Sequence, residues 1–404
     1  MGNWFDLPID ILNSIVECLH YTDHIQFRAV CKSWRSNIYN HIKFADNLPW
    51  VMGYEATYQR TRIKSSSFYL YDPSQKRRYH VETKIPAGTK LYASKFGCLL
   101  LSNNTKIWSD SYSFFFYCPF TGEIIQLPEL EMNCRLNQAT FSTAPTSSDC
   151  VIFVFHKHWD EEYNHVADKF CVSTCSPGDT AWSNIWFNGR YRRWISSVAY
   201  SKGVFYCAFQ MRLWLFPIIA AYNPALQEWK KYQCPPFIRR LNHHHECPDD
   251  EYCEYRDVEL IDSPDDNGNL LLSYRYGKGF VCVFRFDQSQ MEWFRIENFM
   301  SNSLYNEYQQ FKSENLNNRV LFCSTVINNI SLPAVEGEAS KLASTIHRCK
   351  YHRRCISSGG KDQSYPQIYD WVGQRWPTHW WNFDLPDLNS DAIVWIQPRH
   401  SQIL

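Results

Sequence analysis

Two short segments gather the histidines and cysteines that would be needed to hold a metal ion. They are HHHECPDDEYC, from His243 to Cys253, and HRCKYHRRC, from His347 to Cys355. A structural zinc site takes four ligands in a tetrahedron, usually from Cys-x2-4-Cys and His-x3-5-His pairs. His347 and His352 have that spacing, but five residues separate the two cysteines in each segment, which is too wide. We therefore expect exposed polar loops in both places and no bound metal or other cofactor.

The same two regions carry opposite charge. Residues 246–259 contain seven acidic side chains and one cation, whereas residues 341–361 contain six Lys and Arg and no acidic residue. Such local fields can steer a partner protein or attract each other, and the alternative is two solvated loops. Because recognition residues usually lie on loops of a rigid scaffold, these segments are the first place to seek substrate selection.

Motifs for catalysis are absent from the sequence. It contains no G-x-S-x-G elbow, no phosphate-binding P-loop and no H-E-x-x-H helix. The Gly277-Lys278-Gly279 segment lacks the third glycine of a dinucleotide-binding loop. We therefore expect a non-catalytic protein.

Composition narrows the function classes further. The 404 residues include 41 basic and 41 acidic side chains, which argues against a general nucleic-acid binder or a membrane-surface protein. The longest apolar run, Leu213 to Tyr222, is too short to span a bilayer. No secretory signal is visible, and cysteines such as Cys98 and Cys207 lie in apolar stretches where a thiol acts as a small hydrophobe. These features predict a reducing intracellular location, in the cytoplasm, the nucleus or both.

The elements that would position functional residues divide the chain near residue 46. Before it, Pro8 suits the first turn of a helix, and apolar residues then recur with helical spacing at Ile11, Leu12, Ile15, Val16 and Leu19. Two further short helices are predicted, the last carrying Trp34. Three short helices have too little interior to be stable alone, so residues 1–46 form a small domain that needs a partner surface.

The segment LPIDILNSIVECLHYTDHIQFRAVCKSWRS, within residues 4–44, resembles the F-box, a helical module that docks substrate receptors onto a Skp1-type adaptor. The resemblance implies seven residues for the adaptor-facing and core apolar surface: Leu7, Pro8, Ile11, Ile15, Val30, Cys31 and Trp34. The alternative is that they only hold a helical bundle together, which is the better interpretation for Leu12, Val16 and Leu19. Leu7 and Pro8 favour partner contact, and Trp34 fits either role.

Beyond residue 46 the sequence reads as repeated hairpins. Five segments share an apolar strand end, a turn and a second strand, and they start at Tyr71, Tyr117, Cys175, Tyr222 and Phe286. A period near 50 residues is typical of propeller blades, which must stack because one blade cannot bury both faces. The tryptophans that follow three of the turns are expected to fill the space between blades.

This region resembles the kelch-like C-terminal domain of plant F-box proteins of the KIB type, through YCPFTGEIIQLP, GVFYCAF and DAIVWIQP. The predicted fold is therefore an α+β multidomain protein. A small F-box would be followed by an all-β propeller-like domain over residues 47–404. Division by the period gives about seven blades, within a range of six to eight. Residues 233–256 and 336–366 fit the repeat poorly and are interpreted as inserted loops.

Together the two resemblances imply the substrate-recognition subunit of a Skp1-cullin-F-box (SCF) ubiquitin ligase. Its partners would be a Skp1-type adaptor, through it a cullin-RING ligase, and an unknown protein substrate. The competing hypothesis is a free-standing propeller that binds a small ligand such as a sugar, with the helices as a packing cap. An enzyme on a propeller scaffold is a third alternative.

Overall fold

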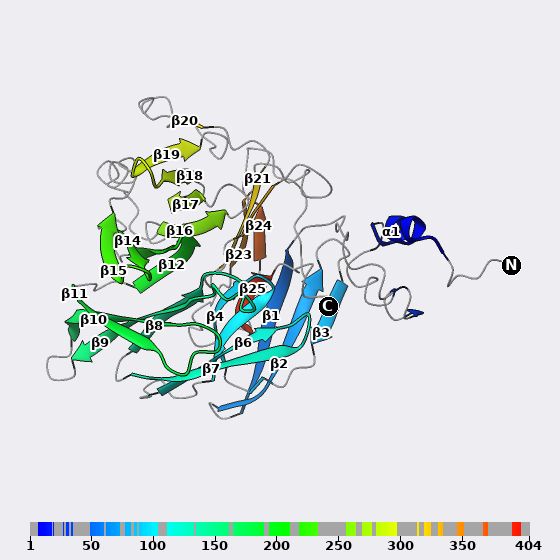
Figure 1. Ribbon diagram of the computed structural model, residues 1–404, viewed down its shortest axis with the longest axis horizontal. Coiled ribbons are helices and arrows are strands. Elements are labelled where there is room, and N and C mark those ends of the chain that lie inside the picture. Colours follow the sequence, from blue (N-terminus) through cyan, green and yellow to red (C-terminus); the bar gives the residue numbers. More distant parts are fainter. Residues whose placement is uncertain are drawn as a thin grey trace, which may run out of the picture.

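The computed structural model describes the chain in segments, and all structural statements concern these residues. They are 7–17, 19, 27, 30–31, 34, 49–59, 62–72, 77–81, 85–86, 89–103, 111–132, 135–160, 165–189, 194–210, 218–232, 256–263, 269–276, 280–296, 313–314, 319–324, 330–333, 346–350, 367–370 and 390–396. One helix, α1 (Ile9–Glu17), lies to one side of a body built of strands (Figure 1).

The strands of the described segments form six sheets, here called blades one to six. Blade one is β25 (Ser390–Ile396), β1 (Trp50–Gln59), β2 (Arg62–Asp72) and β3 (Arg77–Val81). Blade two is β4 (Lys90–Lys95), β5 (Cys98–Ser102), β6 (Ser111–Cys118) and β7 (Glu123–Glu131). Blade three is β8 (Arg135–Phe141), β9 (Ile152–Asp160), β10 (His165–Cys175) and β11 (Ser183–Asn188).

The remaining blades follow in chain order. Blade four is β12 (Trp194–Ser201), β13 (Val204–Gln210), β14 (Ile218–Asn223) and β15 (Glu228–Tyr232). Blade five is β16 (Arg256–Ser263), β17 (Asn269–Tyr276), β18 (Phe280–Asp287) and β19 (Glu292–Ile296), extended by β20 (Ser313–Glu314). Blade six has the order β22 (Ile330–Pro333), β21 (Arg319–Ser324), β23 (Ile346–Lys350) and β24 (Gln367–Asp370).

The blades close into a ring. The first strands of neighbouring blades lie against one another, from β25 and β4 through β8, β12 and β16 to β22, and β21 contacts β25. Strand β25 comes from the far end of the chain yet pairs with β1, so blade one joins both ends of the domain. The predicted propeller is confirmed, and the described strands form six blades, within the expected range of six to eight.

The five repeated segments are the hairpins between the third and fourth strands of blades one to five. Their tryptophans lie between blades, as predicted. Trp182 of blade three donates its indole N–H to the carbonyl of Pro128 in blade two, at 2.8 Å. Trp229 of blade four packs on Phe155 and Phe170 of blade three, with ring centroids 5.7 and 4.9 Å apart. Aromatic packing between blades therefore supplies much of the core.

Bulges in the first strands join neighbouring blades. The pairing with the second strand shifts register around Tyr92, Asn137 and Ser196, the same place in blades two, three and four. The Asn137 side-chain oxygen accepts from the Ile195 N–H at 3.1 Å, and the Ser196 hydroxyl donates to the Val258 carbonyl at 3.1 Å. A bulge re-aims a side chain, and in blades three and four that side chain bonds the first strand to the next blade.

The interpretation of one segment as an inserted loop is partly wrong. Residues 336–366 were expected to be an insertion, but Ile346–Lys350 forms β23, which pairs in parallel with β21. Apolar and charged residues alternate poorly in this strand, so periodicity did not find it. Residues 233–255 of the other proposed insertion lie outside the described residues, and Arg256 begins β16.

The repeated turns share a left-handed position. Gly122, Gln227 and Met291 occupy equivalent places before the fourth strand, with φ of 73°, 53° and 56°. Only glycine adopts this region without a steric cost. We expect Gln227→Gly to raise the free energy of unfolding by about 1 kcal/mol in urea titration. Ala225→Gly in the same turn serves as the control and should lower it; a loss of stability in both variants would contradict the prediction.

Candidate functional site

The N-terminal helices expose apolar side chains around a small core. Helix α1 begins after Pro8, whose carbonyl accepts from the N–H groups of Ile11 and Leu12, both at 3.1 Å. Buried Leu12, Phe27 and Trp34 form the centre of the cluster, and the Phe27 and Trp34 rings stack with centroids 4.3 Å apart. Phe27, Val30 and Trp34 have helical backbone, in line with the predicted later helices.

The seven predicted adaptor-facing residues separate into two groups. Pro8, Ile11 and Val30 are exposed, Ile11 by 48% and Val30 by 52%. Leu7, Ile15 and Cys31 are partly buried against the core cluster, and Trp34 is buried within it. Trp34 therefore holds the bundle together, whereas an adaptor role for the exposed residues stays a prediction. Leu12 and Leu19 pack in the cluster, which confirms their structural role.

Sequence reasoning missed Ile9, which is 41% exposed in the first turn of α1. It precedes the apolar spacing that begins at Ile11, so its type, an isoleucine next to Pro8 at a helix start, was the available signal. The exposed apolar residues of this module are Pro8, Ile9, Ile11 and Val30, and we call these four residues the helical patch. Exposed apolar side chains on a small helical module are candidates for contact with another protein.

The strand domain carries an ion pair that crosses the ring. Lys95, at the end of β4 in blade two, bonds Asp262, near the end of β16 in blade five, with 3.1 Å between Nζ and Oδ2. These blades stand three places apart in a ring of six, so the pair spans the axis of the propeller. Lys95 is 7% and Asp262 20% exposed at the side chain.

Blade three holds a serine between a histidine and an asparagine. The Ser173 hydroxyl donates to the Asn184 side-chain oxygen and lies 2.8 Å from His156 Nε2. Because a hydroxyl has one hydrogen, Ser173 accepts from His156, which places the ring hydrogen on Nε2. Ser173 and His156 are 0% and 2% exposed, so no substrate reaches them. The three side chains link neighbouring strands within blade three, β9, β10 and β11.

Burial makes the other candidate nucleophiles weak. It raises the pKa of the Cys150 and Cys171 thiols to about 11 and that of Cys175 to about 12. The thiolate is the reactive form, so these groups are inert at neutral pH. Lys157 differs from the thiols, because burial lowers its pKa to about 8 and so increases the share of neutral amine, on a residue that is 9% exposed.

No cluster of three metal-ligating side chains occurs in the part of the chain that the structure describes. The proposed His243–Cys253 segment lies outside it, and of His347–Cys355 only the backbone of β23 is described. Within the same segments, no helix is long and apolar enough to cross a membrane.

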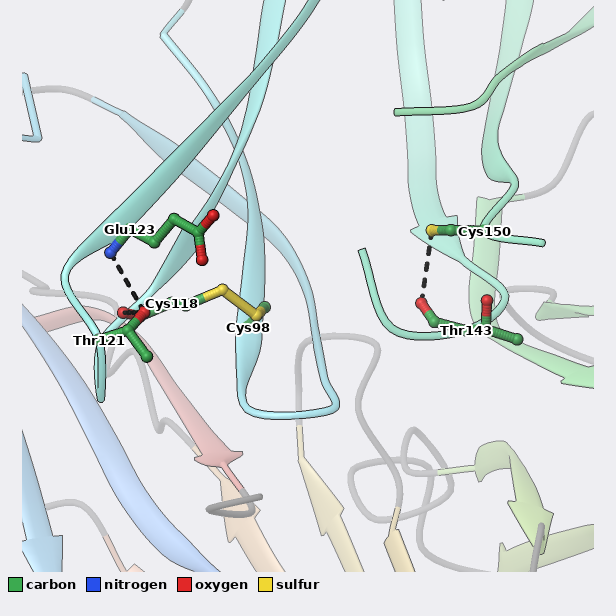
Figure 2. The surroundings of a disulfide bond; sticks show 6 residues. All are labelled: Cys98, Cys118, Thr121, Glu123, Thr143 and Cys150. Carbon is green, nitrogen blue, oxygen red and sulfur yellow. Dashed lines mark hydrogen bonds between the residues drawn. A yellow bond between two sulfur atoms is a disulfide. The ribbon is translucent and has the colours of Figure 1, made fainter. Parts of the chain in front are cut away.

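One expectation about cysteine is wrong. Cys98 was expected to be a thiol, but it forms a disulfide with Cys118 (Figure 2). The sequence lacked the signal because the two residues are 20 positions apart, and only strand pairing brings them together. Cys207 is a free, fully buried thiol, as predicted for a small hydrophobe.

Comparisons with known proteins match two families to separate parts of the chain. The F-box domain family matches residues 4–45, and the KIB1-4 beta-propeller family matches residues 70–342. An F-box/kelch-repeat protein of Arabidopsis thaliana is 31% identical over 292 residues, covering 72% of each chain. An F-box protein of the same plant is 26% identical over 293 residues, covering 72% of this chain and 68% of its own length.

Solved structures are more distant. TolB from Acinetobacter baumannii superposes with a TM-score of 0.39 at 8% identity, covering 84% of this chain and 65% of that one. A likeness at this level carries no argument about function.

Proposed function

Because the chain belongs to the F-box proteins that carry a KIB1-4 beta-propeller, we propose that it is the substrate-recognition subunit of an SCF-type ubiquitin ligase. The helical patch would bind a Skp1-type adaptor, and through it a cullin-RING ligase. The propeller would hold a protein substrate. The observation that carries the proposal is exposed Ile9, Ile11 and Val30 on a module that matches the F-box.

In this scheme the protein contributes proximity and no chemistry of its own. Holding a substrate beside a charged conjugating enzyme turns a meeting of two molecules into an intramolecular step. That role needs a rigid holder, and the bonds between first strands of neighbouring blades, such as Asn137 to Ile195, support it. The inert buried thiols and the inaccessible Ser173 also favour a non-catalytic subunit. We further propose an intracellular location, where ubiquitin ligases act.

The adaptor interaction is tested by placing charge on the helical patch. We expect Ile11→Asp with Val30→Asp to weaken binding to a Skp1-type adaptor at least about tenfold, because each carboxylate must be desolvated at an apolar interface. The measurement is binding of the purified full-length chain to the adaptor by calorimetry, with circular dichroism to verify the fold.

The matched control is Leu226→Asp, since Leu226 is 62% exposed but lies on the blade-four turn, far from the helices in the chain. This variant should bind the adaptor as tightly as the parent. If the folded parent shows no binding, or if the double variant binds unchanged, the helices act as a packing cap and the proposal fails.

A further inference from the structure

Blade two carries a covalent link between neighbouring strands. The disulfide joins Cys98, the first residue of β5, to Cys118, the last residue of β6 (Figure 2). Both side chains are buried, with 0% and 2% exposure. The bond therefore lies inside the blade, at the end where the chain turns from β4 into β5 and from β6 into β7.

Strand register alone brings these two cysteines together. Leu99 pairs with Tyr117, so Cys98 and Cys118 are directly opposite. The Asn103 N–H donates to the Ser113 carbonyl, which marks the hydrogen-bonded pairs and places Cys98 and Cys118 at a pair without backbone bonds. Such pairs have the closest Cα atoms in an antiparallel sheet, and here the Cα–Cα distance is 4.2 Å. The backbone thus holds the sulfur atoms within reach of each other in either oxidation state.

The equivalent hairpin of blade four has no disulfide at this place. Extending the pairing by one residue aligns Cys98 and Cys118 with Val204 and Asn223 in blade four. There the Asn223 side chain accepts from the N–H groups of Ala225 and Leu226, at 3.0 and 3.2 Å.

A cysteine bound in a disulfide cannot make those bonds, so the turn of blade two relies on the Cys118 carbonyl. It accepts from the N–H groups of Thr121 and Gly122, at 3.1 and 2.8 Å. Backbone bonds therefore close the turn of blade two, and the cysteine pair is an addition that blade four lacks.

The link connects two contacts by which blade two holds other blades. Cys98 follows the turn at Phe96 and Gly97 that starts from Lys95, the residue paired with Asp262 across the ring. Cys118 precedes Phe120, whose ring meets Trp50 of blade one edge-on, with centroids 5.7 Å apart. Cutting the link frees the two turns from each other and loosens both contacts.

Exchange with Cys150, the free cysteine shown near the disulfide, is blocked. Cys150 lies on the neighbouring hairpin of blade three in the same view, and its thiol donates to the Thr143 carbonyl (Figure 2). Its raised pKa, about 11, leaves almost no thiolate to attack the disulfide. An external thiol reaches the buried sulfur atoms only after the two turns at this end of the blade lift.

We propose that Cys98 and Cys118 form a redox-controlled clasp that sets the stability of blade two. One glutathione-type thiolate attacks a sulfur, breaks the S–S bond and forms a mixed disulfide, and a second releases it. The products are two protein thiols and one glutathione disulfide, with two electrons passing from the small thiols to the protein. Glutathione disulfide drives the reverse reaction. In a reducing compartment the clasp is open, and under oxidative stress it closes.

The experiment compares the full chain with Cys98→Val, Cys118→Asn, which installs the residue pair of blade four. Melting temperature is measured by circular dichroism with and without dithiothreitol, and differential alkylation with mass spectrometry counts thiols at these positions. We expect reduction to lower the Tm of the parent by about 5 °C, because the closed loop restricts the unfolded chain. The variant should not respond, and Cys207→Ala should respond as the parent does.

A second readout tests the role of turn opening. In the folded parent, the rate of disulfide reduction should reach a plateau as the dithiothreitol concentration increases, because opening of the turns becomes rate-limiting. In concentrated urea the chain is unfolded, so the rate should keep increasing with the dithiothreitol concentration. An unchanged Tm on reduction, free thiols at both positions under glutathione disulfide, or an equal response from the variant would each overturn the clasp.

Discussion

Replacing Asp262 by alanine is expected to lower the free energy of unfolding by about 3 kcal/mol. The substitution leaves the Lys95 ammonium inside the ring at 7% exposure without the carboxylate that the structure pairs with it. Removing one partner of a buried pair strands the other charge, and this stranded charge accounts for most of the loss. Urea unfolding followed by tryptophan fluorescence measures the effect.

A double variant distinguishes loss of the whole Lys95–Asp262 ion pair from loss of one partner. Lys95→Met with Asp262→Leu removes both charges together and should recover most of the stability, because well-packed apolar groups often replace buried pairs at little cost. Lys230→Met is the control, since its 2.6 Å bond to Glu228 is shorter but both partners are exposed. This control should leave stability almost unchanged. If the double variant were no more stable than Asp262→Ala alone, the stranded charge would not be the cause.

Acidification is expected to destabilise the protein through His156. Burial lowers the pKa of this histidine from 6.5 to about 4. Among the described residues, no hydrogen-bond acceptor faces Nδ1, where an added proton would bind. The unfolded chain therefore binds a proton below pH 6.5, while the folded chain stays neutral until about pH 4. The contribution of neutral His156 to the free energy of unfolding is fully present above pH 6.5 and is lost as the pH falls toward 4.

The size of this effect follows from the two pKa values. Each pH unit between them costs about 1.4 kcal/mol, so the share of His156 is about 2 kcal/mol at pH 5. Urea titrations at pH 7.5 and pH 5 should give a smaller difference for His156→Gln than for the parent by about that amount. His80→Gln, at an exposed position of β3, should keep the parental pH dependence. Equal pH dependence in all three proteins would exclude His156 as the titrating group.

The repeated hairpins were predictable because their signals are local. An apolar strand end, a turn and a second strand lie within about a dozen residues, as from Tyr222 to Tyr232, and turn chemistry does not depend on distant contacts. Trp229 was assigned to the space between blades from its place after the turn, and the structure confirms it. The helical start at Pro8 and the buried role of Leu12 were predictable for the same reason.

What the structure alone decided depends on partners far apart in the chain. The F-box resemblance placed both Ile11 and Trp34 in the adaptor-facing and core apolar surface, and three-dimensional packing exposes the first and buries the second. The blade number, the pairing of β25 with β1 and the reach of Lys95 to Asp262, 167 positions away, all require the ring to close. The sequence by itself determined the helical module at the start of the chain, the strand domain that follows it and the hairpin that repeats in that domain. The disulfide, the buried His156 and the ion pair were decided by register and blade order, because these bring together residues that no local pattern relates.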